Sequence, residues 1–150
     1  MDMAKIDHEI KSKFPNNKTK AIVNVLYTSA WLSNKQNTFL KPYDISPQQY
    51  NILRILRGAK GELLTVHSIK ERMIDKAPNV TRLVDKLLDK ELTSRTRCEH
   101  DRRVVWIGIT EKGLNLLADL EPIIKEFDSH SELTEEEAQT LSNLLDKLRP

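Results

Sequence analysis

The sequence is poor in the residues that mark several classes of protein. Its 150 residues include only 4 glycines, 6 prolines and 1 cysteine. So few glycines and prolines exclude collagen-like and low-complexity chains and disfavour a turn-dense all-β fold. Glycine-rich phosphate-binding loops are nearly excluded for the same reason. A single cysteine cannot form an intramolecular disulfide, so we expect a reducing compartment.

Long apolar runs are also missing. No stretch approaches the roughly 18 apolar residues that a membrane-spanning helix needs. The segment 1–14 carries charge where a signal peptide would need an apolar run. With 39% hydrophobic and 31% charged residues, the chain fits one soluble globular domain. We therefore expect a cytoplasmic protein without a membrane partner.

Charge is distributed unevenly along the chain. Residues 54–103 carry 13 basic and 8 acidic side chains, a net charge of +5, whereas residues 104–150 have a net charge of −6. A basic middle segment favours a polyanionic partner. A mixed, solvated surface is the alternative, and charge alone does not separate the two.

Apolar periodicity predicts helices around one β-hairpin. Residues 1–18 lack a clear period, so we expect a loose or short-helical segment there. The predicted helices span residues 19–40, 46–58, 65–73, 78–90, 110–127 and 134–148, and the predicted strands span residues 94–98 and 104–109. Pro122 lies inside the fifth helix and is expected to bend it.

Polar residues mark where several of these helices begin. Ser46 and Gln49 form the pattern of a capping box, and Thr134 and Glu137 repeat it at the last helix. Thr110 is a further N-terminal cap. These signals favour well-defined helix starts at both ends of the chain.

The order of the elements predicts a mainly α (α+β) fold with a winged helix-turn-helix. Two short helices joined by a tight turn and followed by a hairpin have this layout. Such a lobe would occupy residues of about 45–110, and the helices over about 1–41 and 111–150 would form a dimerisation region. Their apolar stripes favour a homodimer, and a monomer that buries every stripe in one core is the alternative.

The two short helices carry polar side chains that suit DNA. Small or polar residues near the start of a recognition helix reach base edges, where Asn pairs with adenine and Arg with guanine. A solvated helix face is the alternative for such residues. The candidate DNA contacts from these helices are Thr65, Ser68, Pro78, Asn79, Thr81, Arg82 and Lys86.

The hairpin carries four arginines within nine residues: Arg95, Arg97, Arg102 and Arg103. The first two project from the same face of their strand. Arginine suits phosphate groups and narrow minor grooves. We expect Asp101 to orient a neighbouring guanidinium through a charge-assisted bond. A salt-bridged exposed turn is the alternative.

Two central segments resemble the MarR family of transcriptional regulators. Residues 101–113 (DRRVVWIGITEKG) resemble the wing-to-helix signature of that family, and residues 80–87 (VTRLVDKL) resemble its recognition helix. Residues 46–50 (SPQQY) resemble the start of its second helix. The similarity covers about residues 19–148.

The resemblance implies a homodimer on a pseudo-palindromic operator in double-stranded DNA. Recognition helices of the family enter successive major grooves, and each wing places an arginine in or beside the minor groove. Arg103 is then the candidate for the minor groove, with Asp101 holding it. Family members commonly repress genes and release DNA when a small ligand binds or a cysteine is oxidised. We therefore expect a repressor that a small ligand releases.

Two segments depart from the family pattern. The family usually has glycine just after the recognition helix, whereas this chain has Lys90-Glu91-Leu92. Because glycine favours the left-handed backbone there, we expect a differently shaped helix end. The connector over residues 74–77 also lacks the family's frequent pattern.

Aromatic residues and the lone cysteine are the remaining candidates. The resemblance implies an effector pocket between the dimerisation helices and the DNA-binding lobe, where Tyr27, Trp31 and Tyr50 are candidate ligand-binding residues. Plain core packing is the alternative. Cys98 is interpreted as an ordinary strand residue, and a redox-sensing regulator that uses Cys98 is the alternative function.

The sequence favours no enzymatic function. It contains none of the common nucleophile, zinc-protease or nucleotide-binding motifs. Cys98 and His100 are too small a cluster for a metal site, so no metal or other cofactor is expected. The rival class is a winged-helix protein-interaction module without DNA binding, which would have no need for four arginines in the wing.

Overall fold

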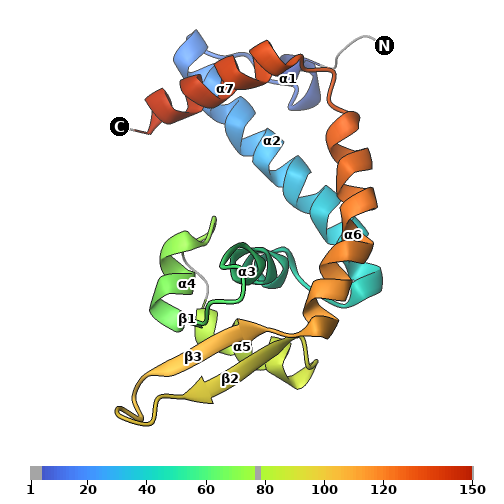
Figure 1. The fold of residues 1–150 in the computed structure, drawn as a ribbon. Coiled ribbons are helices and arrows are strands. Elements are labelled where there is room, and N and C mark those ends of the chain that lie inside the picture. The colour runs from blue at the N-terminus through green and yellow to red at the C-terminus, as the bar shows by residue number, and fades with distance from the viewer. Residues whose placement is uncertain (1–4, 77–78, 150) are drawn as a thin grey trace.

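The computed structural model describes residues 5–76 and 79–149, which form a lobe and a terminal region (Figure 1). The lobe contains the helices α3 (Pro47–Gly58), α4 (Val66–Arg72) and α5 (Val80–Asp89) with a small sheet. The terminal region contains α1 (Ile6–Glu9), α2 (Asn17–Leu40), α6 (Glu111–Ser129) and α7 (Glu135–Leu148). A short 3-10 helix, η1 (Lys41–Tyr43), leads from α2 towards α3. The predicted mainly helical winged helix-turn-helix fold is confirmed.

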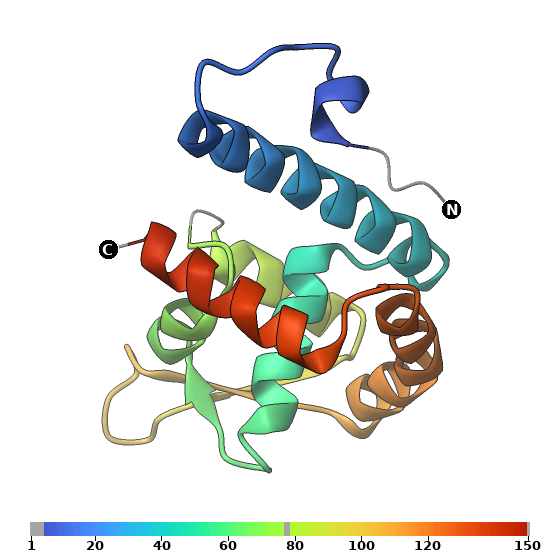
Figure 2. The same cartoon turned by 90° about the horizontal axis from the view of Figure 1, so that it is seen from above.

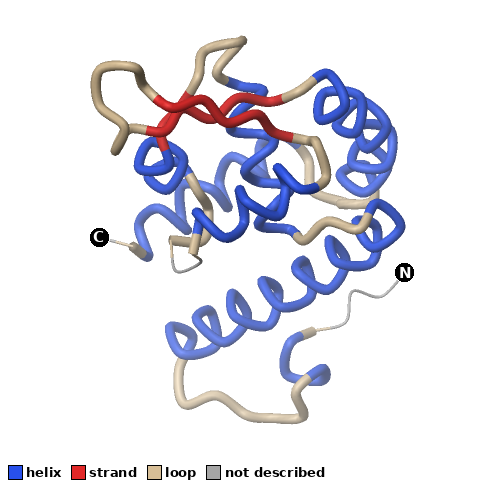
Figure 3. The backbone as a smooth tube through the Cα atoms, turned by 90° about the horizontal axis from the view of Figure 1, so that it is seen from below, coloured by secondary structure: helices blue, strands red, loops and turns tan. Residues whose placement is uncertain are grey.

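The sheet is antiparallel and has three strands in the order β1-β3-β2. These strands are β1 (Leu64–Thr65), β2 (Thr93–Arg97) and β3 (Val105–Ile109). In the hairpin Thr93 pairs with Ile109 and Arg97 with Val105. Seen from below, the strands lie along one side of the molecule and α2 along the other (Figure 3). The two-residue β1 was not predicted, because so short a segment shows no alternation.

The core lies between α3, α5, the sheet and the lobe-side ends of α2 and α6. Leu53, Leu87 and Ile107 are fully buried within the lobe. Leu40 at the end of α2 and Leu120 on α6 are buried in the same cluster. Helices α2 and α6 are therefore joined to the core at their lobe-side ends.

Most of the terminal helices present apolar side chains that this chain does not cover. No residue of α7 is buried. The α7 residues Leu141, Leu144 and Leu148 are 45%, 59% and 44% exposed, and Leu26 on α2 is 65% exposed. Helices α2 and α7 overlap in Figure 1 but lie apart in Figure 2, so they do not cover each other.

Within the described ranges, no helix combines the length and the apolar character that crossing a membrane requires.

The helix starts follow the capping residues closely. Both predicted capping boxes form, at α3 and at α7. Thr110 caps α6 through a bond from the Gly113 amide. Asn16 caps α2, which therefore begins two residues earlier than expected. Helix α6 continues through Pro122. The bend expected at this residue stays a prediction.

The end of α5 corrects the prediction of a differently shaped helix terminus. Glu91 has a φ of 60°, in the left-handed region. Its amide donates to the Leu88 carbonyl at 2.9 Å, and the Leu92 amide donates to the Leu87 carbonyl at 3.0 Å. These two bonds form a Schellman motif. Glu91 thus adopts the backbone that glycine would favour, and the prediction was wrong.

Candidate nucleic-acid interface

Helix α5 has one buried and one exposed face. Val80, Val84 and Leu87 are buried against the lobe. Arg82 and Lys86 are exposed on the other side, as is Thr81. Because the apolar face fixes the rotation of the helix, the basic side chains are held on a defined outer surface.

Asn79 is the N-cap of α5, and its amide oxygen already accepts one hydrogen bond within the chain. Asn79 Oδ1 accepts a bond from the Arg82 backbone N–H at 3.2 Å. Bidentate pairing with adenine needs the oxygen as well as the nitrogen of the amide. Because an amide oxygen can accept two bonds, Asn79 keeps one acceptor position and its Nδ2 donors, and its predicted contact with a base stays a prediction. Pro78, another predicted contact, lies outside the described residues.

Helix α4 begins with the other two predicted contacts. Thr65 Oγ1 accepts a bond from the Ser68 backbone N–H at 3.1 Å, which caps the helix. Both side chains are half-buried. The Ile74 N–H donates to Asn51 Oδ1 on α3 at 2.9 Å, which anchors the segment after α4. The Thr65 hydroxyl is therefore engaged in the cap of α4, and the predicted DNA contacts of Thr65 and Ser68 stay predictions.

The two strand arginines differ in their surroundings. Arg95 faces Ile107 and Arg97 faces Val105 across the hairpin, so both lie on the same face of β2. Arg95 Nη2 lies 3.0 Å from Asp85 Oδ1 on α5, and the Arg95 side chain is 35% exposed. This ion pair connects the wing to α5. Arg97 is exposed at the end of the strand.

Asp101 positions the backbone of the wing tip. Its carboxylate accepts a bond from the Arg103 backbone N–H at 3.0 Å. The Val104 N–H donates to the Asp101 carbonyl at 3.0 Å, which closes a β-turn with aspartate at its first position. In the described part of the chain Asp101 makes no ion pair with a guanidinium and bonds to the Arg103 main chain instead, so its predicted role in orienting the Arg103 guanidinium stays a prediction.

The surface formed by α5 and the hairpin carries four exposed arginines. Arg82, Arg97, Arg102 and Arg103 have no ion-pair partner within residues 5–76 and 79–149. The hairpin that carries three of them projects at the end of the molecule opposite to the two termini (Figure 1). Their guanidinium groups are free to bind phosphate.

Cys98 lies just beyond the end of β2 and is half-buried. The pKa of its thiol is lowered, chiefly by the backbone N–H groups of Asp101 and His100 and further by Trp106, while burial opposes the shift. A lowered pKa increases the thiolate fraction at neutral pH. Cys98 therefore lies one residue beyond the strand in which the sequence placed it, and its role stays a prediction.

The three aromatic ligand candidates have separate contacts. Tyr27 donates a hydrogen bond to Glu9 Oε2 at 2.7 Å. Trp31 stacks on Phe127, with ring centroids 6.2 Å apart. Tyr50 accepts a bond from Arg54 Nη1 at 2.8 Å. The structure does not show these side chains forming one pocket.

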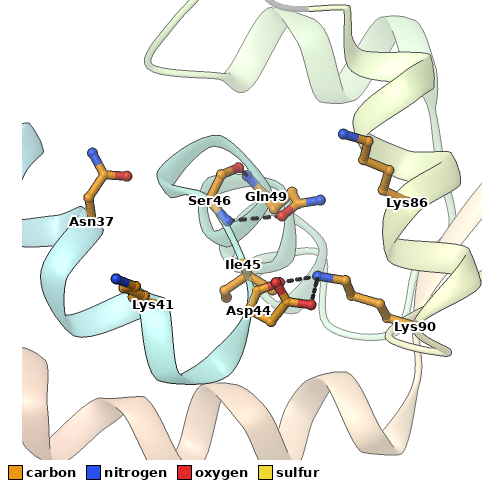
Figure 4. A pocket seen from close by; sticks show the side chains of 8 residues that line it. All are labelled: Asn37, Lys41, Asp44, Ile45, Ser46, Gln49, Lys86 and Lys90. Carbon is orange, nitrogen blue, oxygen red and sulfur yellow. Dashed lines mark hydrogen bonds and ion pairs between the residues drawn. The ribbon is translucent and has the colours of Figure 1, made fainter.

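A cavity of about 450 Å³ lies elsewhere, where η1, the start of α3 and α5 meet, and none of these three aromatics lines it. Its lining includes Lys41 and Lys90, neither of which the sequence analysis proposed as a site residue (Figure 4). Lysines 49 positions apart share no local spacing, so only the fold brings them to one site.

Comparisons with known proteins agree with this geometry. A family model described as MarR family matches residues 45–105. The chain is 31% identical over 119 residues to the HTH-type transcriptional regulator MhqR of Bacillus subtilis (strain 168), which covers 78% of this chain and 81% of that protein.

Solved structures give the same result. The MarR transcription factor from Planctomyces limnophilus has a TM-score of 0.70 and 32% identity, with 91% of this chain and 98% of that chain covered. S. aureus MepR in its DNA-binding conformation has a TM-score of 0.71 and 26% identity, with 85% and 95% covered. The chain therefore belongs to the MarR family of winged helix-turn-helix transcriptional regulators.

Proposed function

We propose that the chain forms a homodimer that represses transcription by binding a pseudo-palindromic operator in double-stranded DNA, and that a small ligand releases it. The observation that carries this proposal is the set of four exposed guanidinium groups on α5 and the wing, none of which has an ion-pair partner in the described part of the chain. Membership of a family of transcriptional regulators supports it. An enzymatic role is not proposed.

In this proposal α5 enters the major groove and the wing reaches the minor groove. Arg82 lies in the first turn of α5, where side chains reach base edges. Arg103 at the wing tip takes the minor-groove position, because arginine is attracted to narrow minor grooves. The Asp85–Arg95 ion pair joins these two parts, so they would engage the duplex at a fixed spacing.

The apolar faces of the terminal helices supply the interface between two copies. Leu26 on α2 and Leu144 on α7 are more than half exposed in a single chain. A two-fold dimer would cover the same face on both copies. The two α5 helices would then match half-sites about 34 Å apart on one face of the duplex.

The wing assignment is tested by Arg103→Ala. Fluorescence anisotropy with a duplex selected from a random pool should show a loss of about 1 to 3 kcal/mol in binding free energy. Lys125→Ala, which removes an exposed charge on α6, is the matched control and should bind like the parent. Equal affinity of the Arg103 variant and the parent at moderate salt would refute the wing assignment.

The role of Asn79 in reading bases is tested separately from its role as a cap. Asn79→Ser keeps a good N-cap residue but removes the amide nitrogen. If Asn79 reads a base, this variant should relax the preference at one position of each half-site. A uniform loss of affinity across sequences would instead make Asn79 a contact to the DNA backbone.

The lowered pKa of Cys98 favours a second candidate, in which oxidation of this thiol alters the wing and weakens DNA binding. Peroxide should then reduce operator affinity of the parent and leave that of Cys98→Ser unchanged. The same response in both proteins would exclude Cys98 as the sensor and leave the ligand-released repressor as the proposal.

A further inference from the structure

The connector between α4 and α5 is fixed by packing at its two ends. Met73, where α4 ends, is 2% exposed, and Val80, the first residue of α5, is 4% exposed. Between these two residues Ile74 is 88% exposed, and the other side chains that the structure describes there are exposed as well. Apolar packing therefore does not hold the described part of the connector, so the position of its main chain depends on hydrogen bonds.

The Ile74 N–H has its acceptor outside α4. Met73 is extended, with a ψ of 142°, so α4 ends there and the next N–H leaves the helical bonding pattern. The Ile74 N–H donates to Asn51 Oδ1 on α3 at 2.9 Å. Lys76 Nζ bonds to the Glu71 carbonyl, which joins the connector back to α4. The bond to Asn51, in contrast, joins the connector to another helix of the lobe.

Asn51 lies on a part of α3 that is well fixed in the lobe. Its neighbours Ile52 and Leu53 are fully buried, whereas Asn51 itself is half-buried. Both bonds of the capping box between Ser46 and Gln49 fix the start of this helix (Figure 4). The Asn51 amide therefore extends from a rigid support, and its bond to Ile74 holds the connector at a defined place relative to α3.

We propose that Asn51 is a positioning residue for DNA recognition, which sets the place of the start of α5 through its bond to the Ile74 N–H. The start of α5 carries Asn79 and Arg82, the candidate contacts to bases. Hydrogen bonds to base edges need donor–acceptor distances of about 2.7 to 3.2 Å, whereas contacts to phosphates contribute affinity for any duplex. Loss of the Asn51 bond should therefore lower sequence preference more than it lowers binding to DNA in general.

The role of Asn51 in recognition rests on the proposed function, whereas the anchoring of the connector does not. Two substitutions separate the hydrogen bond from the size of the side chain. Asn51→Leu removes the acceptor and keeps a side chain of similar shape. Asn51→Asp keeps an acceptor oxygen at the same position. The two variants are compared first without DNA and then with DNA.

The anchoring is measured without DNA, by NMR, as the hydrogen-exchange rate of the Ile74 amide in the ¹⁵N-labelled full chain. Asn51→Leu should raise this rate by at least about tenfold, because the bond that protects the amide is lost. Asn51→Asp should retain the protection of the parent, since a carboxylate accepts a hydrogen bond at least as strongly as an amide oxygen. The melting temperature confirms that both variants are folded.

Sequence recognition is measured as a ratio of two affinities, one for a duplex selected from a random pool and one for a duplex of the same length with scrambled half-sites. Asn51→Leu should lower this ratio about tenfold, the size expected when one good base contact is lost. Asn51→Asp should keep the ratio within about twofold of the parent, although its added charge weakens binding to both duplexes.

Asn16→Leu is the matched control, because it makes the same substitution and removes the same kind of bond. Asn16 Oδ1 accepts the Thr19 backbone N–H at 2.9 Å where it caps α2. The start of α2 lies at the end of the molecule away from the lobe (Figure 1). This variant should lower the melting temperature, as the loss of a cap does, and leave both the Ile74 exchange rate and the affinity ratio within about twofold of the parent.

Three results would overturn the inference. The first is parent-like exchange of the Ile74 amide in Asn51→Leu, which would show that the bond does not anchor the connector. The second is an equal loss of affinity for both duplexes in that variant, which would separate the anchor from sequence recognition. The third is an equal fall of the ratio in Asn16→Leu, which would show a general effect of lower stability. If the parent itself prefers no duplex, the proposed function fails and the role of Asn51 in recognition fails with it, while the exchange rates still decide whether the anchor exists.

Discussion

The lobe and the terminal helices both carry large apolar side chains but bury them differently. In the lobe, Leu53, Leu87 and Ile107 are fully buried by neighbours from the same chain. In the terminal region, Leu26 and Leu144 remain 65% and 59% exposed. The core of the lobe is therefore closed within one chain, whereas the terminal helices leave large apolar side chains uncovered. The comparison separates the proposed DNA-binding surface from the proposed dimer interface.

The two regions do not differ in how well their helices begin. Capping boxes form at α3 in the lobe and at α7 in the terminal region. Local sequence therefore specifies helix α7 as clearly as α3, although no residue of α7 is buried. What distinguishes the regions is tertiary packing, and the following substitutions test that difference.

The largest expected effect is on the core of the lobe. Leu87→Ala should lower the free energy of unfolding by about 2 to 5 kcal/mol, because it removes a fully buried side chain and leaves a cavity. Chemical denaturation at equilibrium measures this. A loss below about 1 kcal/mol, the size expected at an exposed site, would contradict the assignment of Leu87 to a closed core.

The next effect concerns the apolar face of α7. Leu144→Asp should weaken the proposed dimer by about 2 to 4 kcal/mol, since it places a charge in the interface of both copies. Sedimentation equilibrium should show a shift towards monomer, with the helical content by circular dichroism retained. An unchanged mass would remove α7 from the interface.

A smaller effect is expected where α6 meets the wing. A Cβ on Gly113 would lie 2.4 Å from the Leu92 carbonyl oxygen and 2.7 Å from Ile109 Cγ1. Gly113→Ala should therefore destabilise the chain by about 1 to 3 kcal/mol. Gly58→Ala is the control, because a Cβ there meets nothing within 4 Å. Thermal unfolding should show a loss for the first variant and none for the second.

The smallest effect is the pH dependence of α7. Bonds from the Thr134 backbone N–H and hydroxyl lower the pKa of Glu137 below its ordinary value of 4.5. The folded pKa is below the unfolded one, so this cap stabilises α7 above the unfolded pKa and is lost as the pH falls through the folded value. Circular dichroism between pH 6 and pH 3 should show this loss in the parent, and Glu137→Gln should lack it.

Local signals made the fold largely predictable. The caps at Ser46, Thr110 and Thr134 each place a helix start correctly because a cap acts over three or four residues. The alternation in residues 104–109 likewise identified β3 to within one residue. These features depend on neighbours in the sequence, so the sequence alone reveals them.

The contacts within the site were less predictable. The Asp85–Arg95 pair joins a helix to a strand, and no spacing rule links the two. Asp101 was expected to bond to a side chain, but its carboxylate accepts the Arg103 backbone N–H. This bond depends on the turn that the wing tip forms, which the spacing of residues does not reveal. Glu91 in a left-handed conformation was missed because two backbone bonds outweigh the local preference for glycine. The predicted DNA and ligand contacts themselves stay predictions.

The central claim is that two copies of α5 and its wing bind one duplex with two-fold symmetry. Selection of bound duplexes from a random pool tests it most directly. The proposal predicts an enriched, two-fold-symmetric consensus whose half-sites are about one helical turn, or about 34 Å, apart. A pool with no enrichment, or with a consensus lacking dyad symmetry, would contradict it.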